Sequence, residues 1–166
     1  IERNMEMKLF KELLPYIMIV VVVVAIRAFI ATPVRVDGAS MNPTLEDGEI
    51  LILKKYDRSL ERFDIVVLDY NGEKLVKRVI GLPGEKIAYK DNKLYVDGKR
   101  VKEPFEHEVT DDFELEEQIP EGYYFVLGDN RINSTDSRMI GAISKEQIQG
   151  TTNFSIFPFD KFGTVK

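Results

Sequence analysis

The stretch KLVKRVI, residues 74–80, has the alternation of a β-strand with two different faces. One face carries Leu75, Lys77 and Val79, and the other carries Val76, Arg78 and Ile80. The sequence GLPGE that follows predicts a turn at the end of this strand. The pattern therefore places one lysine between two apolar neighbours on the same face.

Similar short β signals lie on both sides of this stretch. They are EILILKKY (49–56), FDIVVLDY (63–70), KIAYKDNKLYVDGKRV (86–101), GYYFVLGDN (122–130) and GTTNFSIFPFD (150–160). The third reads as a hairpin around Asp91-Asn92 with a further turn at Asp97-Gly98, and SKEQIQ predicts one helical turn capped by Ser144. Many short strands separated by turns predict a mainly β fold, barrel-like or a sandwich.

An apolar run precedes the β segments. Residues 13–31 would span about 28 Å as a helix, close to the roughly 30 Å of a bilayer core. We expect a single transmembrane helix here, with residues 1–12 in the cytoplasm because Arg3, Lys8 and Lys11 precede the run. A buried core helix and a cleaved signal peptide are the alternatives, although Phe29 is too large for the cleavage pattern of a signal peptide.

The β part is then expected on the outer side of the membrane. Residues 32–84 and 121–166 are predicted to form the main β domain, with 85–120 as a small insertion that holds the hairpin and an acidic segment. That segment, Glu103 to Glu121, has nine acidic residues and no Lys or Arg. A solvated, mobile excursion is the favoured interpretation, and a binding surface for a basic partner is the alternative.

Composition excludes several functions. The 166 residues carry a net charge of −5, which argues against a nucleic-acid binder. The chain has no cysteine, so it has neither disulfides nor thiol catalysis. Its single histidine, His107, excludes a zinc site built on several His or Cys ligands.

A candidate nucleophile lies in GASMNPTLEDGE, residues 38–49. Ser40 needs a proton acceptor to attack a carbonyl, although a serine in this sequence is also ordinary turn chemistry. His107 stands in an acidic stretch and is expected to be a surface histidine. A lysine serves only when neutral, and an apolar site favours the neutral form. Lys77 fits that requirement better than Lys54 or Lys55.

A third polar segment is GDNRINSTDSRMIG, residues 128–141. It packs two Asp, two Arg and two Ser between glycines. Asp–Arg pairing is geometrically demanding and would hold hydroxyl groups in fixed positions near a neutral amine. A charged turn before the last strands is the plainer interpretation.

Taken in order, these motifs resemble those of the type I signal peptidases of the Gram-positive-like bacterial kind. They are the apolar run, SMNPTL (40–45), FDIVVL (63–68), VKRVIGLPGE (76–85) and GDNRINSTDSR (128–138). The resemblance covers nearly the whole chain. It implies a Ser–Lys dyad peptidase with a signal peptidase catalytic domain on a membrane anchor, and it implies no cofactor and no metal.

The resemblance also implies individual roles. Ser40 would be the nucleophile, Lys77 the general base, and Ser134 a hydrogen-bonding partner of the lysine amine. Asp136 and Arg138 would form an ion pair beside the site, and Asp129 would pair with Arg78. The Ser40 N–H would donate to the oxyanion. Some relatives add a serine hydroxyl at the position of Gly38, so this chain lacks that donor.

The implied substrates are membrane-targeted preproteins, cut after small residues at positions −1 and −3. The apolar positions that match the substrate pockets are Val34, Val36, Met41, Leu45, Leu75 and Val76, each of which is equally well explained as strand core. The lipid bilayer is the other expected partner, and the sequence does not identify a translocase. Two other classes stay open: a self-cleaving Ser–Lys peptidase of the SOS-repressor type, and a membrane-tethered binding module without activity.

Overall fold

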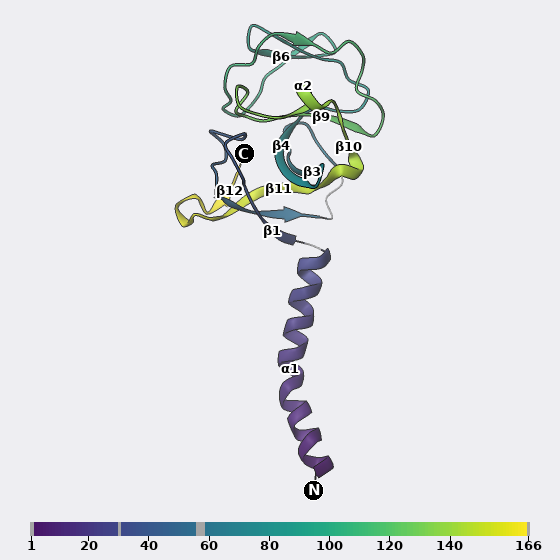
Figure 1. Ribbon diagram of the computed structural model, residues 1–166, viewed down its shortest axis with the longest axis vertical. Helices are drawn as coiled ribbons and strands as arrows, with labels where there is room; N and C mark the ends of the chain where they lie inside the picture. The colour runs from purple at the N-terminus through teal and green to yellow at the C-terminus, as the bar shows by residue number, and fades with distance from the viewer. Residues whose placement is uncertain (1, 30, 56–58, 166) are drawn as a thin grey trace.

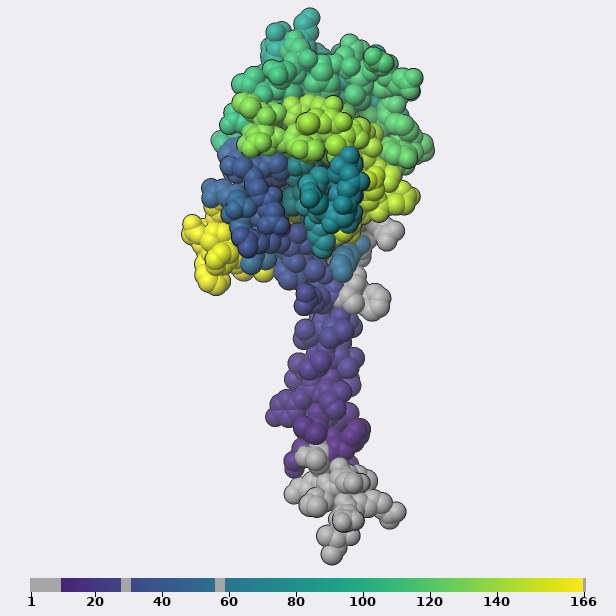
Figure 2. Space-filling model, viewed as in Figure 1, coloured from purple at the N-terminus to yellow at the C-terminus, as the bar shows by residue number. Residues whose placement is uncertain are grey.

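A long helix projects from a β-sheet domain. The structure is a computed structural model that describes residues 2–29, 31–55 and 59–165. Helix α1 (Glu2–Phe29) stands apart from the β-strands, with the N-terminus at its far end (Figure 1). Each large apolar side chain from Leu13 to Ile26 is at least 42% exposed, and the helix has no neighbour along these residues in the space-filling view (Figure 2). This apolar surface is therefore uncovered in the isolated chain.

The end of the helix differs from the predicted span of residues 13–31. Helix α1 ends at Phe29, and Ala31 already belongs to strand β1 (Ala31–Arg35), while Ile30 lies outside the described residues. The strand was not predicted, because its start merges with the apolar run in the sequence. Among the residues that the structure describes, no helix combines the length and apolarity needed to cross a membrane.

The larger sheet confirms the predicted mainly β fold. Its strand order is β1-β2-β11-β3-β4-β9-β10, with β12 paired to β11. The bounds are β2 (Ile50–Lys54), β3 (Ile65–Tyr70), β4 (Glu73–Gly81), β9 (Tyr123–Leu127), β10 (Ile143–Ser144), β11 (Ile148–Phe157) and β12 (Gly163–Thr164). Strands β1 and β10 end this path and do not pair with each other in the described residues, so the predicted barrel-like form is not a closed barrel.

A second sheet lies at the end of the molecule away from α1 (Figure 1). Its order is β7-β6-β5-β8, with bounds β5 (Ile87–Lys90), β6 (Lys93–Val96), β7 (Lys99–Val101) and β8 (Phe113–Glu114). The predicted hairpin turn is present, since Asp91 and Asn92 have φ values of 51° and 56° and thus adopt the left-handed conformation that such a turn requires. The chain enters this sheet after β4 and returns from it to β9.

Apolar side chains join the two sheets. One buried cluster combines residues of β4, β5, β6 and β9 with Ile119 from the loop before β9; its members are Ile80, Ile87, Tyr89, Leu94, Val96, Ile119, Phe125 and Leu127. A second cluster lies on the Lys77 face of β4 and consists of Val66, Leu68, Val79, Tyr124, Val126 and Ile143. A third lies among β1, β2, β3 and the loop after β1. The strand positions are thus fixed by burial on both faces of the larger sheet.

Several predictions for the loops need correction. The acidic segment 103–121 is not a solvated excursion throughout, because the side chain of Glu103 is 5% exposed and Thr110 and Ile119 are buried. His107 is likewise not a surface histidine, since its side chain is 12% exposed. Helix α2 (Ser137–Ile140) was not predicted, since it is a single turn inside a charged stretch. The turn predicted after Ser144 is the 3₁₀ helix η1 (Lys145–Gln147), and another, η2 (Phe159–Lys161), follows β11.

Candidate active site

Ser40 lies on the loop between β1 and β2. The Ser40 carbonyl accepts the N–H of Asn130 at 3.0 Å, and the Asn130 side-chain amide donates to the Ala39 carbonyl at 3.1 Å. The Gly38 N–H donates to the Asp47 carboxylate at 2.8 Å. These bonds fix the loop on both sides of the serine, so its backbone is held before any ligand binds.

Lys77 reaches this serine from strand β4. Its Nζ donates to Ser40 Oγ at 2.7 Å, across 37 residues of sequence. The residue is only 2% exposed, and its strand neighbours Leu75 and Val79 pack in the same apolar cluster, as the alternation of the sequence predicted. The structure therefore brings together the two residues that sequence reasoning singled out.

The environment of Lys77 favours the neutral amine. Burial is the main cause and lowers the pKa of Lys77 from 10.5 to about 8. The carboxylates of Asp136 and Asp129 act in the opposite direction, and the charge of Arg138 adds to the lowering. A neutral amine in contact with a hydroxyl is able to accept its proton.

Arg78, the next residue of β4, forms a buried ion pair. Its guanidinium donates to both carboxylate oxygens of Asp129, at 2.9 Å and 2.6 Å, and neither side chain is more than 2% exposed. Asp129 also accepts from the Thr44 hydroxyl at 2.5 Å, and the ring of Phe105 lies 3.9 Å from the guanidinium carbon. Because Thr44 follows Ser40 in the same loop, this ion pair connects β4 to the serine loop and to the loop after β9.

Asp136 and Arg138 form a second ion pair at the start of α2. Arg138 donates to the two Asp136 oxygens at 2.9 Å and 2.8 Å, and Asp136 also accepts the Gly128 N–H at 3.1 Å. Burial acts to raise the pKa of Asp136, but the hydrogen bonds from Arg138 and Gly128 outweigh it and lower this pKa. Asp136 and Arg138 thus act on Lys77 in opposite directions, the carboxylate raising its pKa and the guanidinium lowering it.

Ser134 is placed beside the dyad without a bond to it. A Cβ at Gly128 would collide with both Ser134 Oγ and the Ser40 carbonyl, so these two groups converge on the same glycine. Ser134 Oγ is buried and has no hydrogen-bond partner among the described residues. The expected bond from Ser134 to the lysine amine is therefore not formed in this structure.

The six apolar residues expected to form substrate pockets are divided between two buried clusters. Five of them belong to one buried cluster, and Leu75 packs in the other cluster, on the Lys77 face. The five are Val34, Val36, Met41, Leu45 and Val76, with exposures between 0% and 7%. These five are core residues in the isolated chain, and Leu75 is half-buried.

Sequence reasoning missed several residues of the site. Asn130 donates to Ala39 in the serine loop, and Thr44, in that loop, donates to Asp129. Arg131 forms a buried ion pair with Glu103. Asn130 and Arg131 stand inside the quoted GDNR motif, which was a usable signal for both. The pairing of Glu103 with Arg131 had no signal, because 28 residues separate the two.

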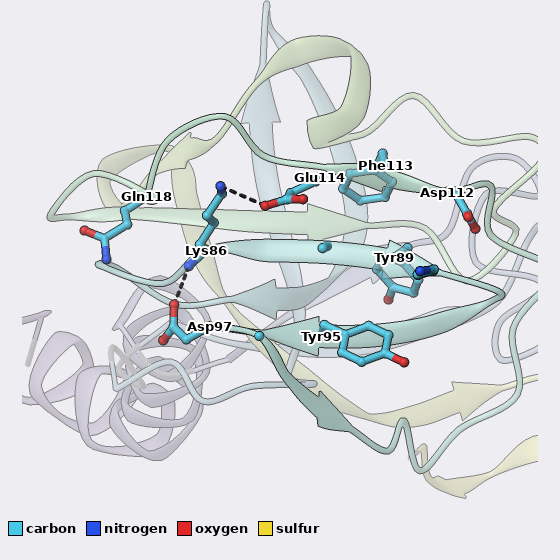
Figure 3. Close-up of a pocket in the computed structure, with 11 residues that line it drawn as sticks. Lys86, Tyr89, Tyr95, Asp97, Asp112, Phe113, Glu114 and Gln118 are labelled. Carbon is cyan, nitrogen blue, oxygen red and sulfur yellow. Dashed lines mark hydrogen bonds and ion pairs between the residues drawn. The ribbon is translucent and has the colours of Figure 1, made fainter.

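An open hollow of about 590 Å³ lies elsewhere, on the second sheet (Figure 3). Its lining includes Ala88, Tyr95 and the ion pair between Lys86 and Glu114 at 2.8 Å. Neither Ser40 nor Lys77 lines it, so its size does not make it the reacting centre. Over the described ranges, no three His, Asp or Glu side chains are grouped so that they could hold a metal ion.

Comparison with known proteins agrees with this geometry. Residues 9–157 match the family described as "Signal peptidase, peptidase S26". Signal peptidase I of Bacillus caldolyticus is 45% identical over 89% of this chain and 91% of its own length. Signal peptidase I T of Bacillus subtilis is 43% identical over 89% of this chain and 84% of its own length.

A solved structure is similar as well. The crystal structure of a signal peptidase I from Enterococcus faecalis has a TM-score of 0.52 and 38% identity, and the match covers 56% of this chain and 96% of that one. A buried lysine against a serine on a β scaffold defines a class of serine hydrolases that use an amine in place of histidine. Together with the match over most of its length, this shows that the chain belongs to the signal peptidase S26 family and is a peptidase of the signal peptidase I type.

The pKa of Lys77 predicts a cost in stability that depends on pH. The folded-state pKa lies below the ordinary value, so charging Lys77 destabilises the fold below about pH 8, and this penalty fades between about 8 and 10.5. We expect Lys77→Met to raise the free energy of unfolding near pH 7 by up to about 3 kcal/mol, with a smaller gain near pH 10. Urea unfolding at both pH values measures the gain.

Lys74→Met is the matched control, because Lys74 lies on the same strand and is exposed. A Lys77→Met variant that is no more stable than the wild type near pH 7 would contradict a desolvated amine at this position.

Proposed function

We propose that the protein removes signal peptides from secreted preproteins, with Ser40 as nucleophile and Lys77 as general base. The observation that carries this proposal is the 2.7 Å contact between Lys77 Nζ and Ser40 Oγ within an apolar cluster. Family membership supports the reaction class, since the similar proteins from Bacillus are named signal peptidase I. Neither observation requires a cofactor.

The proposed reaction has two stages. Neutral Lys77 accepts the Ser40 hydroxyl proton as Oγ bonds to the scissile carbonyl carbon, and the same proton then passes to the leaving amine as the C–N bond breaks. In the second stage Lys77 takes a proton from water, whose oxygen attacks the acyl-serine ester. The ester bond breaks, and the proton returns to Ser40 Oγ. The enzyme is thereby restored.

The Ser40 N–H is the proposed donor to the oxyanion. Gly38 supplies no hydroxyl group, and its own N–H is engaged by Asp47 at 2.8 Å. An amide that is already bonded to a carboxylate is a poor substitute for a missing donor, so we expect stabilisation at this position to depend on the Ser40 amide. Ser134 is proposed to hold the lysine amine once Lys77 has lost its proton.

Substrate choice is proposed to depend on the apolar residues around the dyad. Val34, Val36, Met41, Leu45 and Val76, which share one buried cluster, and Leu75, on the Lys77 face of β4, are proposed to admit only small side chains at −1 and −3. Their exposures of 7% or less for the first five support shallow depressions rather than deep pockets. Small side chains such as alanine would bind without displacing this core.

The membrane is proposed to hold the site close to emerging preproteins. The apolar part of α1, from residue 13 to its end at Phe29, would span the bilayer, with residues 1–12 in the cytoplasm and the β-sheets outside. Phe157, Phe159 and Phe162 are 45%, 82% and 62% exposed and would rest in the outer interface. The main catalytic domain would then comprise residues 32–84 and 121–166, with 85–120 as its insertion.

The dyad is tested by substitution. Detergent-solubilised full-length protein should cleave a preprotein that carries alanine at −1 and −3. Because the base and the nucleophile act in the transition state, Lys77→Ala should lower kcat by about 10²- to 10⁴-fold, and Ser40→Ala by at least as much. Gel analysis of the cleaved preprotein gives the rates.

The exposed Lys74→Ala on the same strand is the control and should cleave at the wild-type rate. Cleavage at the wild-type rate in both the Ser40→Ala and the Lys77→Ala variant would contradict the proposed mechanism. An inactive wild type would favour a binding module.

The rate should also depend on pH. Since only neutral Lys77 accepts a proton and its pKa is lowered to about 8, kcat/KM should rise through about pH 8 and then level off. Near pH 6 about one amine in a hundred is neutral, so kcat/KM should be roughly a hundredfold below its plateau. Initial rates between pH 5 and 10 measure this, with circular dichroism at each pH to verify folding. A flat profile would contradict a lysine base.

Orientation in the membrane is testable because the chain has no cysteine. A single cysteine in place of Lys99, on the exposed part of β7, should react with a membrane-impermeant maleimide on intact cells. A cysteine in place of Glu12 should react only after the cells are opened, since residues 1–12 would lie in the cytoplasm. The reverse pattern of labelling would overturn the proposed orientation.

A further inference from the structure

A strap that follows the second sheet's strand β7 contacts the loop after β9. We use this name for residues 103–110, the first part of the acidic segment, which follow β7. Three contacts tie the strap to the loop after β9: Glu103 pairs with Arg131, the Glu108 N–H donates to the Asp129 carbonyl at 3.0 Å, and Thr110 accepts from Arg131 at 2.7 Å. None of the roles assigned above uses these contacts.

The buried charge of Arg131 is the centre of the strap contacts. Its side chain is 0% exposed, and Glu103, at 5%, is its ion-pair partner, with Arg131 Nη2 2.6 Å from Glu103 Oε1. The Tyr89 hydroxyl, on β5 (Figure 3), donates to the same glutamate oxygen at 2.7 Å and accepts from Arg131 at 3.0 Å. His107 lies 3.1 Å from the other Glu103 oxygen. A buried guanidinium is costly without such a counter-charge.

Arg131 also stabilises the loop 128–131, which is hydrogen-bonded to Ser40. Its Nε donates to the Gly128 carbonyl at 3.0 Å, which closes the loop 128–131. Inside that loop, the Asn130 N–H is bonded to the Ser40 carbonyl and Asp129 is bonded to Arg78, the neighbour of Lys77. A displacement of this loop would therefore shift Ser40 through its bond to Asn130, and Lys77 through the pairing of Asp129 with the neighbouring Arg78.

Phe105 adds an apolar cover to the same region. Its ring lies over the Arg78 guanidinium at 3.9 Å and edge-on to Phe63, with ring centroids 5.4 Å apart. It thereby shields the Arg78–Asp129 pair from water on the strap side, where the low dielectric strengthens that pair. Both the ionic and the apolar contacts of the strap thus bear on groups next to the dyad.

We propose that Glu103 is a positioning residue, which acts through Arg131 to hold the loop 128–131 against Ser40. The first carboxylate of the acidic segment then serves the active site from within the molecule. This proposal rests on the proposed function only for its effect on cleavage. The link from Glu103 to the loop is a statement about structure, and it is measured separately.

The first experiment measures the link without activity. Hydrogen exchange of full-length protein in detergent should show a protected Asn130 amide, because it is bonded to the Ser40 carbonyl. In Glu103→Gln that amide should exchange at least about tenfold faster, since the loop loses its charged support. Glu116→Gln is the matched control, an exposed glutamate of the same acidic segment outside the strap. Unchanged exchange in a folded Glu103→Gln variant would overturn the proposal, whether or not the wild type cleaves preproteins.

The second experiment uses the cleavage assay. Misplacing Ser40 should lower kcat between about tenfold and about a hundredfold while KM stays within about threefold, because the strap acts on the loop that positions Ser40 and not on the proposed pocket residues. Glu116→Gln should cleave at the wild-type rate. A variant with raised KM and unchanged kcat would contradict a positioning role, since that split indicates a role in substrate binding.

A double variant tests whether Glu103 acts through Arg131. If the two act as a unit, Glu103→Gln combined with Arg131→Gln should lose no more kcat than Arg131→Gln alone. Should Glu103→Gln fail to fold, Glu103→Leu with Arg131→Met replaces the buried pair by apolar groups, a change that such sites often tolerate. A folded double variant with wild-type kcat and wild-type protection of Asn130 would overturn the proposal.

Discussion

The removal of water from one amine is the constraint on which the rest of the site depends. Lys77 occupies a strand position where its neighbours on the same face are Leu75 and Val79, and burial there lowers its pKa to about 8. The chain accepts an energetic cost at this position that an apolar residue would avoid. In return it holds an amine that is more easily deprotonated, as the proposed role of a base requires. The contact with Ser40 Oγ then gives that base one defined hydrogen-bond partner.

Charged groups around the dyad are all held in pairs. Arg78 pairs with Asp129, Arg138 with Asp136, and Arg131 with Glu103, and in each pair the carboxylate is at most 5% exposed. At Lys77 the pKa-raising effects of Asp136 and Asp129 are opposed by the charge of Arg138. The same pairs also fix loops that have little regular secondary structure. Electrostatic balance and loop rigidity therefore come from one set of contacts.

The sequence was sufficient for features that depend on local pattern. Period-two alternation identified the face of Lys77, and the Asp91-Asn92 pair identified the hairpin of the second sheet. It was insufficient where distant segments meet. Nothing local distinguishes the buried Glu103 from the other carboxylates of its segment, and its burial depends on Arg131, which lies 28 residues later. The start of β1 was missed because apolar residues favour helix and strand equally at Ala31, and tertiary pairing with β2 decides between them.

The order of strands in the larger sheet has a consequence for when the enzyme matures. Strand β11 lies between β2 and β3, yet it follows both in the sequence by about 80 residues or more. During synthesis, β2, which follows the Ser40 loop, and β3, which precedes Lys77, would therefore lack their shared neighbour until residues 148–157 emerge. The nascent chain carries both reactive groups long before their scaffold is complete. The central strand therefore completes the scaffold of Ser40 and Lys77 only after both residues have been made.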